Sequence, residues 1–241
     1  MSQERVPQVL GEERRCVETL DALRRAQQDM KRGRLFLHFG EAFIERLAGY
    51  VEGYRTCMRV NGLEDGRYER FCVWLRHVKQ EQPVEESPVS YLRAHHGDHE
   101  QAIRKYLNLV EEFASSPLVD CAPAYPEAAS SPRGGRPVTG ILKYLLRIRQ
   151  DLQRGQLRLH VREVDAQRFN TFVDGYNACM EFNGFADGQY GRFRDWLRDV
   201  KKEFPGEGWP VAYLRTCHGD PERAISRYLD FVAEFADLPS P

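Results

Sequence analysis

Apolar residues recur at spacings of three and four along several stretches of the chain, a pattern that predicts amphipathic α-helices. The clearest stretch covers about residues 41–60, and Asn61-Gly62 follows it as a typical helix end. We also predict a helix over residues 14–32, one that begins after Asp65, a short one around Tyr91 and a last one that ends near Phe113. Asp65 is expected to cap the helix that it precedes.

Two short segments, residues 35–39 and 157–161, alternate instead between apolar and polar positions. A period of two residues predicts a β-strand. A lone strand leaves backbone groups unpaired, so we expect the two strands to pair with each other. The result would be a two-stranded ribbon across a pseudo-twofold axis.

These elements occur twice because the chain repeats itself. A shift of 122 residues places Gly175 on Gly53, and residues 142–236 then align with residues 20–114 without a gap and with about half of the positions identical. The period is much longer than that of solenoid repeats, and each copy can bury a core of its own. We therefore predict a mainly α protein, a tandem duplication of a small helical domain with about five helices and one short strand per copy.

The two copies are predicted to cover residues 14–114 and 139–237. Between them, residues 115–138 contain five prolines among Ala, Ser and Gly, without apolar periodicity, which predicts a linker. Cys121 should be exposed there. The Arg133-Gly134-Gly135-Arg136 segment could contact RNA, but it occurs once and is short.

Composition narrows the class of protein. The chain has 241 residues, of which 41% are hydrophobic and 29% charged, as in globular proteins. A formal net charge of -1 argues against a broad basic surface for nucleic acid. With no apolar stretch of about 18 residues and no signal-peptide core in the first 15, we expect a cytoplasmic protein without a membrane partner. The six cysteines form no Cys-x-x-Cys pair, so we expect packing roles and neither a metal nor another cofactor.

Each copy has a His-Gly-Asp sequence before its last helix, and this motif supplies the candidate catalytic residues His96, Asp98, His218 and Asp220. A histidine near an aspartate can serve as a base with an orienting carboxylate. The motif is equally typical of a joint between helices, in which the glycine takes a left-handed conformation and the aspartate caps the next helix. We favour this structural role.

Other histidines also raise the question of chemistry. His95, His96 and His99 cluster in the first copy, but the second copy does not reproduce the cluster, so a dedicated zinc site is not expected. His38 and His160 occupy equivalent positions, where we expect a hydrogen-bonded structural histidine.

Aromatic and basic residues combine near the end of the third helix of each copy, where a tryptophan precedes an arginine and a lysine. This combination is typical of protein interfaces. It is also compatible with single-stranded nucleic acid, or with a tryptophan in the core beside cations that complement the helix dipole. The candidate binding residues are Trp74, Arg76, Lys79, Trp196, Arg198 and Lys201.

The repeat, the balanced charge and these motifs favour a non-enzymatic intracellular protein-binding or adaptor protein. Neutralising or sequestering a partner, as immunity proteins do, is one concrete form of this function. Two modules in one chain could bind a twofold target, or could pack together as a covalent pseudo-dimer. One alternative is an enzyme with a His/Asp site at the interface of the two repeats, and another is an arginine-mediated nucleic-acid binder.

Overall fold

The computed structural model describes residues 16–34, 41–81, 88–116, 138–185, 188–203 and 205–238. Over these residues the protein contains ten α-helices, one 3-10 turn and no strand. The prediction of a mainly α protein is therefore confirmed for this part of the chain. Among the described helices, none has the length and apolarity that crossing a membrane requires.

Five helices belong to the first half of the chain. They are α1 (Thr19–Lys31), α3 (Ile44–Val60), α4 (Gly66–His77), α5 (Ser90–Ala94) and α6 (His99–Ala114). The helix predicted at residues 41–60 thus begins three residues later than expected and ends where expected. The predicted first helix, residues 14–32, is shorter at its start.

The second half has five helices and the 3-10 turn. They are α7 (Ile141–Gln153), the turn η4 (Leu157–Leu159), α8 (Ala166–Phe182), α9 (Gln189–Asp199), α10 (Trp209–Thr216) and α11 (Pro221–Ala236). The first, second and last helices of this half are equal in length to α1, α3 and α6.

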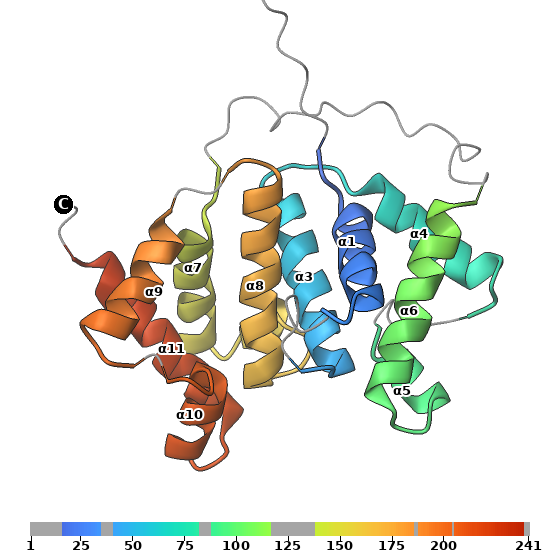
Figure 1. Cartoon of the computed structure of the whole chain (residues 1–241). Helices are drawn as coiled ribbons and strands as arrows, with labels where there is room; N and C mark the ends of the chain where they lie inside the picture. Colours follow the sequence, from blue (N-terminus) through green and yellow to red (C-terminus); the bar gives the residue numbers. More distant parts are fainter. Residues whose placement is uncertain are drawn as a thin grey trace, which may run out of the picture.

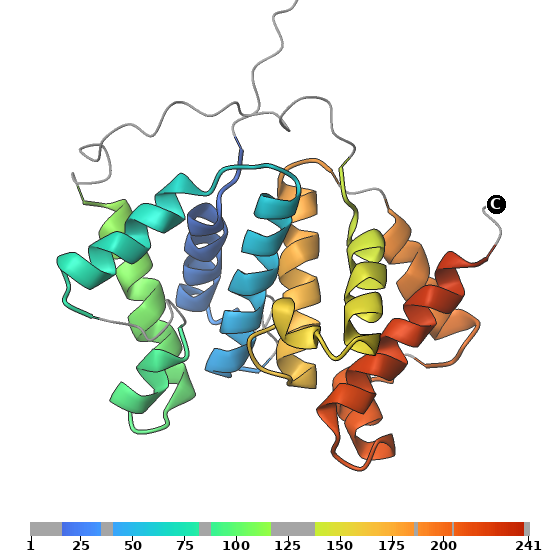
Figure 2. The same ribbon diagram turned by 180° about the vertical axis from the view of Figure 1, so that it is seen from behind.

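The helices α3 and α8 run side by side through the middle of the molecule (Figure 1). Helix α1 lies on the outer side of α3, and α7 lies on the outer side of α8. The remaining helices form two outer groups, α4 to α6 at one end and α9 to α11 at the other, as the view from behind also shows (Figure 2). A single apolar core runs through both halves.

Glycines make the close contact between α3 and α8. A Cβ atom added to Gly53 would lie 1.9 Å from the carbonyl oxygen of Phe172, and one added to Gly175 would lie 2.0 Å from that of Tyr50. At Gly49 the distance to the carbonyl oxygen of Arg168 would be 2.3 Å. These distances are far below van der Waals contact, so only residues without a side chain allow the two backbones to approach this closely. We call this contact the α3–α8 seam.

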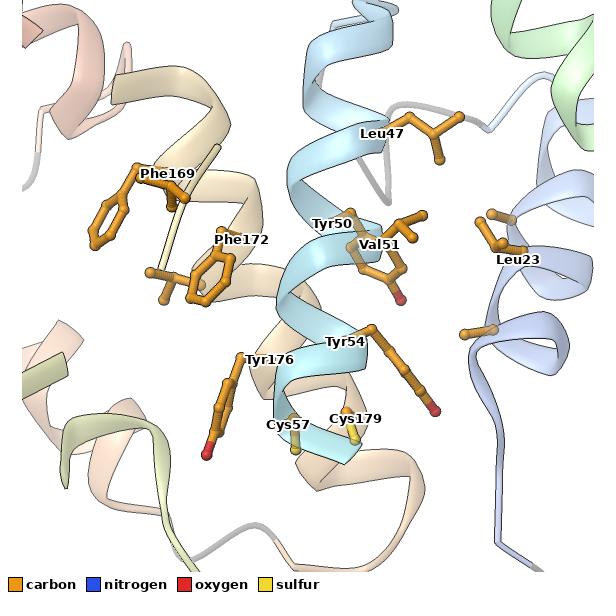
Figure 3. Packing of buried hydrophobic residues seen from close by; sticks show 14 of the residues in the cluster. Leu23, Leu47, Tyr50, Val51, Tyr54, Cys57, Phe169, Phe172, Tyr176 and Cys179 are labelled. Atoms are coloured by element: carbon orange, nitrogen blue, oxygen red, sulfur yellow. The ribbon is translucent and has the colours of Figure 1, made fainter. Parts of the chain in front are cut away.

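Large side chains fill the space on both sides of the seam (Figure 3). Tyr50 and Tyr54 project from α3 toward α1, whereas Phe172 projects from α8 on the other side. Cys57 and Cys179 lie close together at one end of the seam and are fully buried. Burial raises the pKa of the Cys179 thiol, which therefore stays protonated and packs as a small apolar group.

Hydrogen bonds between the halves hold the starts of their first helices. The Asn183 side chain, just beyond α8, accepts from the amide of Val17 at 2.8 Å. The Asn61 side chain, just beyond α3, accepts from the amide of Thr139 at 2.7 Å. Each half thus satisfies a backbone donor that precedes the first helix of the other.

Reciprocal hydrogen bonds at helix starts also join α1 to α4 within the first half. Asp65 occupies the N-cap position of α4, as predicted, but its carboxylate accepts from the amide and the hydroxyl of Thr19 in α1, at 2.9 and 2.6 Å. Glu18, the N-cap residue of α1, accepts in return from the amide of Arg67 in α4 at 2.7 Å. The expectation that Asp65 caps its own helix is therefore wrong, because it caps a neighbouring one. Its counterpart Asp187 lies outside the described residues.

The predicted two-stranded ribbon is also wrong. Residues 157–159 form a 3-10 turn in which the amide of His160 donates to Leu157 at 3.0 Å, so the backbone pairs within the segment. Leu157 and Val161, four residues apart, are buried, whereas Leu159 between them is 70% exposed. A strand would have placed all three on one face. The segment that would pair with it, residues 35–39, lies outside the described residues, as do His38, Cys121 and the linker from 117 to 137.

Candidate functional site

The two His-Gly-Asp sequences form the joints between short and long helices. Asp98 accepts from the amide of Gln101 at 3.0 Å and caps α6. Asp220 accepts from the amide of Arg223 at 3.1 Å and caps α11. The hydrogen bond from the Gln101 amide lowers the pKa of Asp98, which favours its charged form at the positive end of the helix.

The histidines of these joints carry part of the backbone turn. His96 has φ 54° and His218 has φ 55°, and each precedes a glycine that also has a positive φ. Both imidazoles are exposed. The joints lie at opposite ends of the molecule in both views (Figures 1 and 2), so the structure does not bring the two histidines and the two aspartates together.

Removal of either cap should destabilise the protein. We expect Asp220→Ala to lower the free energy of unfolding by about 1 kcal/mol, because the Arg223 amide loses its acceptor. Asp98→Ala should act in the same direction. Asp237→Ala at the C-terminal end of α11 is the control and should not destabilise, because a negative charge is unfavourable there. Urea denaturation of the three variants tests this, and a loss with Asp237→Ala but none with Asp220→Ala would contradict it.

The remaining histidines of the first joint do not gather around a metal position. His99 lies with its Nδ1 3.4 Å from the amide of Ile44, against the edge of the Phe43 ring, and 3.3 Å from the carboxylate of Glu45. It therefore holds the start of α3. Within the described residues, no group of three or more His, Cys, Asp or Glu side chains is placed to hold a metal ion.

The candidate binding residues of α4 are divided between core and surface. Trp74 is buried and packs against Phe113 with ring centroids 5.5 Å apart. The Lys79 ammonium lies 5.2 Å from the Trp74 ring and forms an ion pair with Glu112 at 2.5 Å. Arg76 is exposed. Trp74 and Lys79 therefore join α4 to α6.

The equivalent residues of α9 make the same contacts with α11. Trp196 packs against Phe235 at 5.6 Å, and the Lys201 ammonium lies 5.3 Å from the Trp196 ring and pairs with Glu234. Arg198 is exposed and pairs with its neighbours Asp195 and Asp199. In both halves the tryptophan and the lysine hold the outer helices together, so of the six candidates only the arginines remain on open surface.

A groove of about 850 Å³ provides a better candidate site. It follows α3 on the side that faces the segment after α7, which Figure 2 shows running across α8 toward α3. Helix α3, the turn from α3 into α4, the start of α4, Pro88 and residues 158–162 line it. Both halves therefore contribute to this groove, which we call the α3–η4 groove.

Arginines from both halves meet in the groove. Two of them are paired there, Arg55 with Asp65 at 3.7 Å and Arg162 with Glu52 at 3.6 Å. The other two are Arg59 on α3 and Arg158 on η4. Both are exposed, and neither forms an ion pair or hydrogen bond with any described residue. Leu159 lies next to Arg158 and exposes most of its side chain at the same place.

His160 fixes the η4 side of the groove. Its Nε2 donates to the Asp151 carboxylate at 2.8 Å, and in the neutral ring Nδ1 accepts from the Tyr144 hydroxyl at 2.9 Å. The ring is almost completely buried, and its hydrogen bond lowers the pKa of Asp151. Burial raises the pKa of Tyr144, which opposes any role of that hydroxyl as a nucleophile. His160 thus ties η4 to α7, the structural role expected from the sequence.

Glu52, which lines the groove, also takes part in an ion pair between the halves. The guanidinium of Arg168 on α8 is 2% exposed and makes two hydrogen bonds to Glu52 on α3, at 2.6 and 3.3 Å. A third, at 2.7 Å, goes to Glu163. The guanidinium is therefore buried and paired with two carboxylates.

The equivalent carboxylate on the other side of the seam is Asp174, one methylene shorter than Glu52. Within the described part of the chain it has no ion pair and accepts one hydrogen bond, from Asn170 at 3.1 Å. Desolvation raises its pKa to about 6, against the opposing influence of Arg194 and Arg46. Asp174 is nevertheless an exposed residue, so solvent screens its charge and strongly reduces the free energy associated with this shift.

Asp174 should make stability depend on pH. Its folded pKa lies above the ordinary value of 3.8, so the protonated form favours folding, and this contribution is lost as the pH rises through about 6. We expect Asp174→Asn to match the wild type at pH 4 and to be more stable at pH 7, by about 1 kcal/mol after allowance for solvent screening. Thermal unfolding across this range measures it; a difference that grows toward pH 4 would contradict the assignment.

The groove is not visible in the sequence because its residues come from segments that are far apart along the chain. One signal was present: Arg55 and Arg59 occupy positions at which the other copy has Asn177 and Glu181. Comparison with protein-family models, curated proteins and solved structures finds no match to this chain. Its function must therefore be inferred from its own geometry.

Proposed function

We propose that the chain is a non-enzymatic intracellular protein-binding protein that adapts or sequesters its partner. Two duplicated helical units would form one covalent pseudo-dimer. Support for the duplication comes from the sequence repeat, the equal helix lengths and contacts that recur 122 residues apart. The Tyr68–Tyr106 hydroxyl contact of 2.9 Å and the Tyr190–Tyr228 contact of 3.2 Å are one such pair.

The α3–η4 groove is the observation that carries the proposal. It is an open surface feature to which both halves contribute, and it presents the exposed apolar side chain of Leu159 beside Arg59 and Arg158. Arginine beside an exposed apolar anchor is typical of the energetically important centre of a protein interface. By contrast, Asp98 and Asp220 are already used as helix caps.

Affinity capture from the producing cells, with mass spectrometry, tests this proposal. Wild-type protein should recover one protein partner in stoichiometric amount, and Leu159→Asp should lose it. Val200 on the surface after α9 is 65% exposed, so Val200→Asp is the matched control and should retain the partner. Loss with Val200→Asp alone would place binding near Trp196, Arg198 and Lys201 instead. Recovery of the chain without any partner would contradict the proposed function.

A further inference from the structure

We infer that the α3–η4 groove binds an acidic segment of a partner protein, and that carboxylates of this segment pair with Arg59 and Arg158. This inference rests on the proposed function and adds the chemistry of the partner. The segment should also carry an apolar residue that covers Leu159.

Arg59 and Arg158 are available, unlike their neighbours. Arg55 and Arg162 already face carboxylates of the protein itself. Arg59 and Arg158 are exposed and have no partner among the described residues, although they line the same groove from opposite halves. A guanidinium group forms paired hydrogen bonds with a carboxylate, which gives geometric selectivity as well as charge neutralisation.

The groove arginines are specific to one side of the pseudo-dimer. If they were needed to fold the repeated unit, both copies would be expected to contain them. None has an arginine at the equivalent position of the other copy: Arg55, Arg59, Arg158 and Arg162 correspond to Asn177, Glu181, Phe36 and Gly40. On the second side, Asn177 and Glu181 are hydrogen-bonded to each other at 2.7 Å. The difference points to recognition at a single groove rather than to a requirement of the fold.

The charge balance of the groove favours a short acidic segment over nucleic acid. Four carboxylates, those of Glu52, Glu64, Asp65 and Glu69, also line it. A continuous phosphate backbone would meet these carboxylates as well as the arginines. A peptide can place one or two carboxylates at Arg59 and Arg158 and an apolar side chain at Leu159, so it complements the groove without this repulsion.

Fluorescence anisotropy with the purified full chain tests the inference. The probes are labelled ten-residue peptides in which two Asp or Glu residues flank a leucine at separations of one to four residues. We expect at least one peptide to bind saturably, and the variant carrying both Arg59→Ala and Arg158→Ala to bind it at least tenfold more weakly. Arg198→Ala, at another exposed arginine, is the control and should bind like the wild type. The corresponding Asn and Gln peptides should not bind.

Three results would overturn the inference: no acidic peptide binds, the double variant binds equally well, or Arg198→Ala weakens binding as strongly as the double variant. A single-stranded oligonucleotide that binds more tightly than every peptide, with a steep dependence on salt, would replace it with nucleic-acid recognition. The capture experiment separates these failures from that of the proposed function. A partner that is still captured by the double variant would leave protein binding intact while excluding these arginines.

Discussion

Gly53→Ala is expected to destabilise the protein by about 3 kcal/mol or more. The new methyl group would lie 1.9 Å from the carbonyl oxygen of Phe172, and a backbone atom cannot rotate away. Helices α3 and α8 would have to separate, which would loosen the packing of the core on both sides of the seam. Gly175→Ala should have a similar effect, because its methyl group would lie 2.0 Å from the Tyr50 oxygen. Urea denaturation measures both losses.

Gly191→Ala provides the matched control. Gly191 lies within α9, and a Cβ atom added there meets nothing within 4 Å. Alanine is the better helix former, so this variant should be more stable than the wild type by about 0.5–1 kcal/mol. The same substitution would then have opposite signs at two helical glycines. If Gly53→Ala changed stability by no more than Gly191→Ala, the seam would not have the close packing described.

The second large effect is expected from Glu52→Gln. This change removes the charge that neutralises the buried guanidinium of Arg168, which Glu163, itself largely exposed, would then have to balance alone. Breaking a buried ion pair on one side is costly because it leaves an uncompensated charge, and we expect a loss of about 3 kcal/mol in unfolding free energy.

The control for Glu52→Gln is Asp174→Asn, the same chemical change at the equivalent position of the second half. Asp174 has no ion pair with any described residue, so its neutralisation should stabilise the protein at pH 7. The two variants are compared by denaturation at this pH. Equal effects of the same sign would show that the ion pair between Glu52 and Arg168 does not distinguish the two sides.

Helices were predictable from the sequence because their signals are local. The spacing of apolar residues from Ile44 to Met58 and the Asn61-Gly62 pair determine one buried face and one stop signal, and α3 follows both. The caps by Asp98 and Asp220 were likewise predictable from residues within one turn.

The 3-10 turn was not predictable, because its apolar alternation fits two conformations. Leu157 and Val161 are four residues apart, so a helical turn buries both of them. Leu159 could be buried together with them only in a strand. Tertiary contacts select the turn, because His160 is hydrogen-bonded to both Tyr144 and Asp151 of α7. The groove was not predictable for a related reason. Arg59 and Arg158 are far apart in the sequence, and they line the same groove only once η4 has packed beside α3.

The central claim is that α3 and α8 join the two halves through backbone contact at their glycines. Nuclear Overhauser effects in the labelled full-length protein test it most directly. A Cβ atom added to Gly53 would lie 3.0 Å from the Cα of Phe172, and one added to Gly175 would lie 2.9 Å from the Cα of Tyr50. Strong cross-peaks between the α-protons of Gly53 and Phe172, and between those of Gly175 and Tyr50, are therefore predicted. Absence of both, in a protein whose helices are otherwise formed, would contradict the claim.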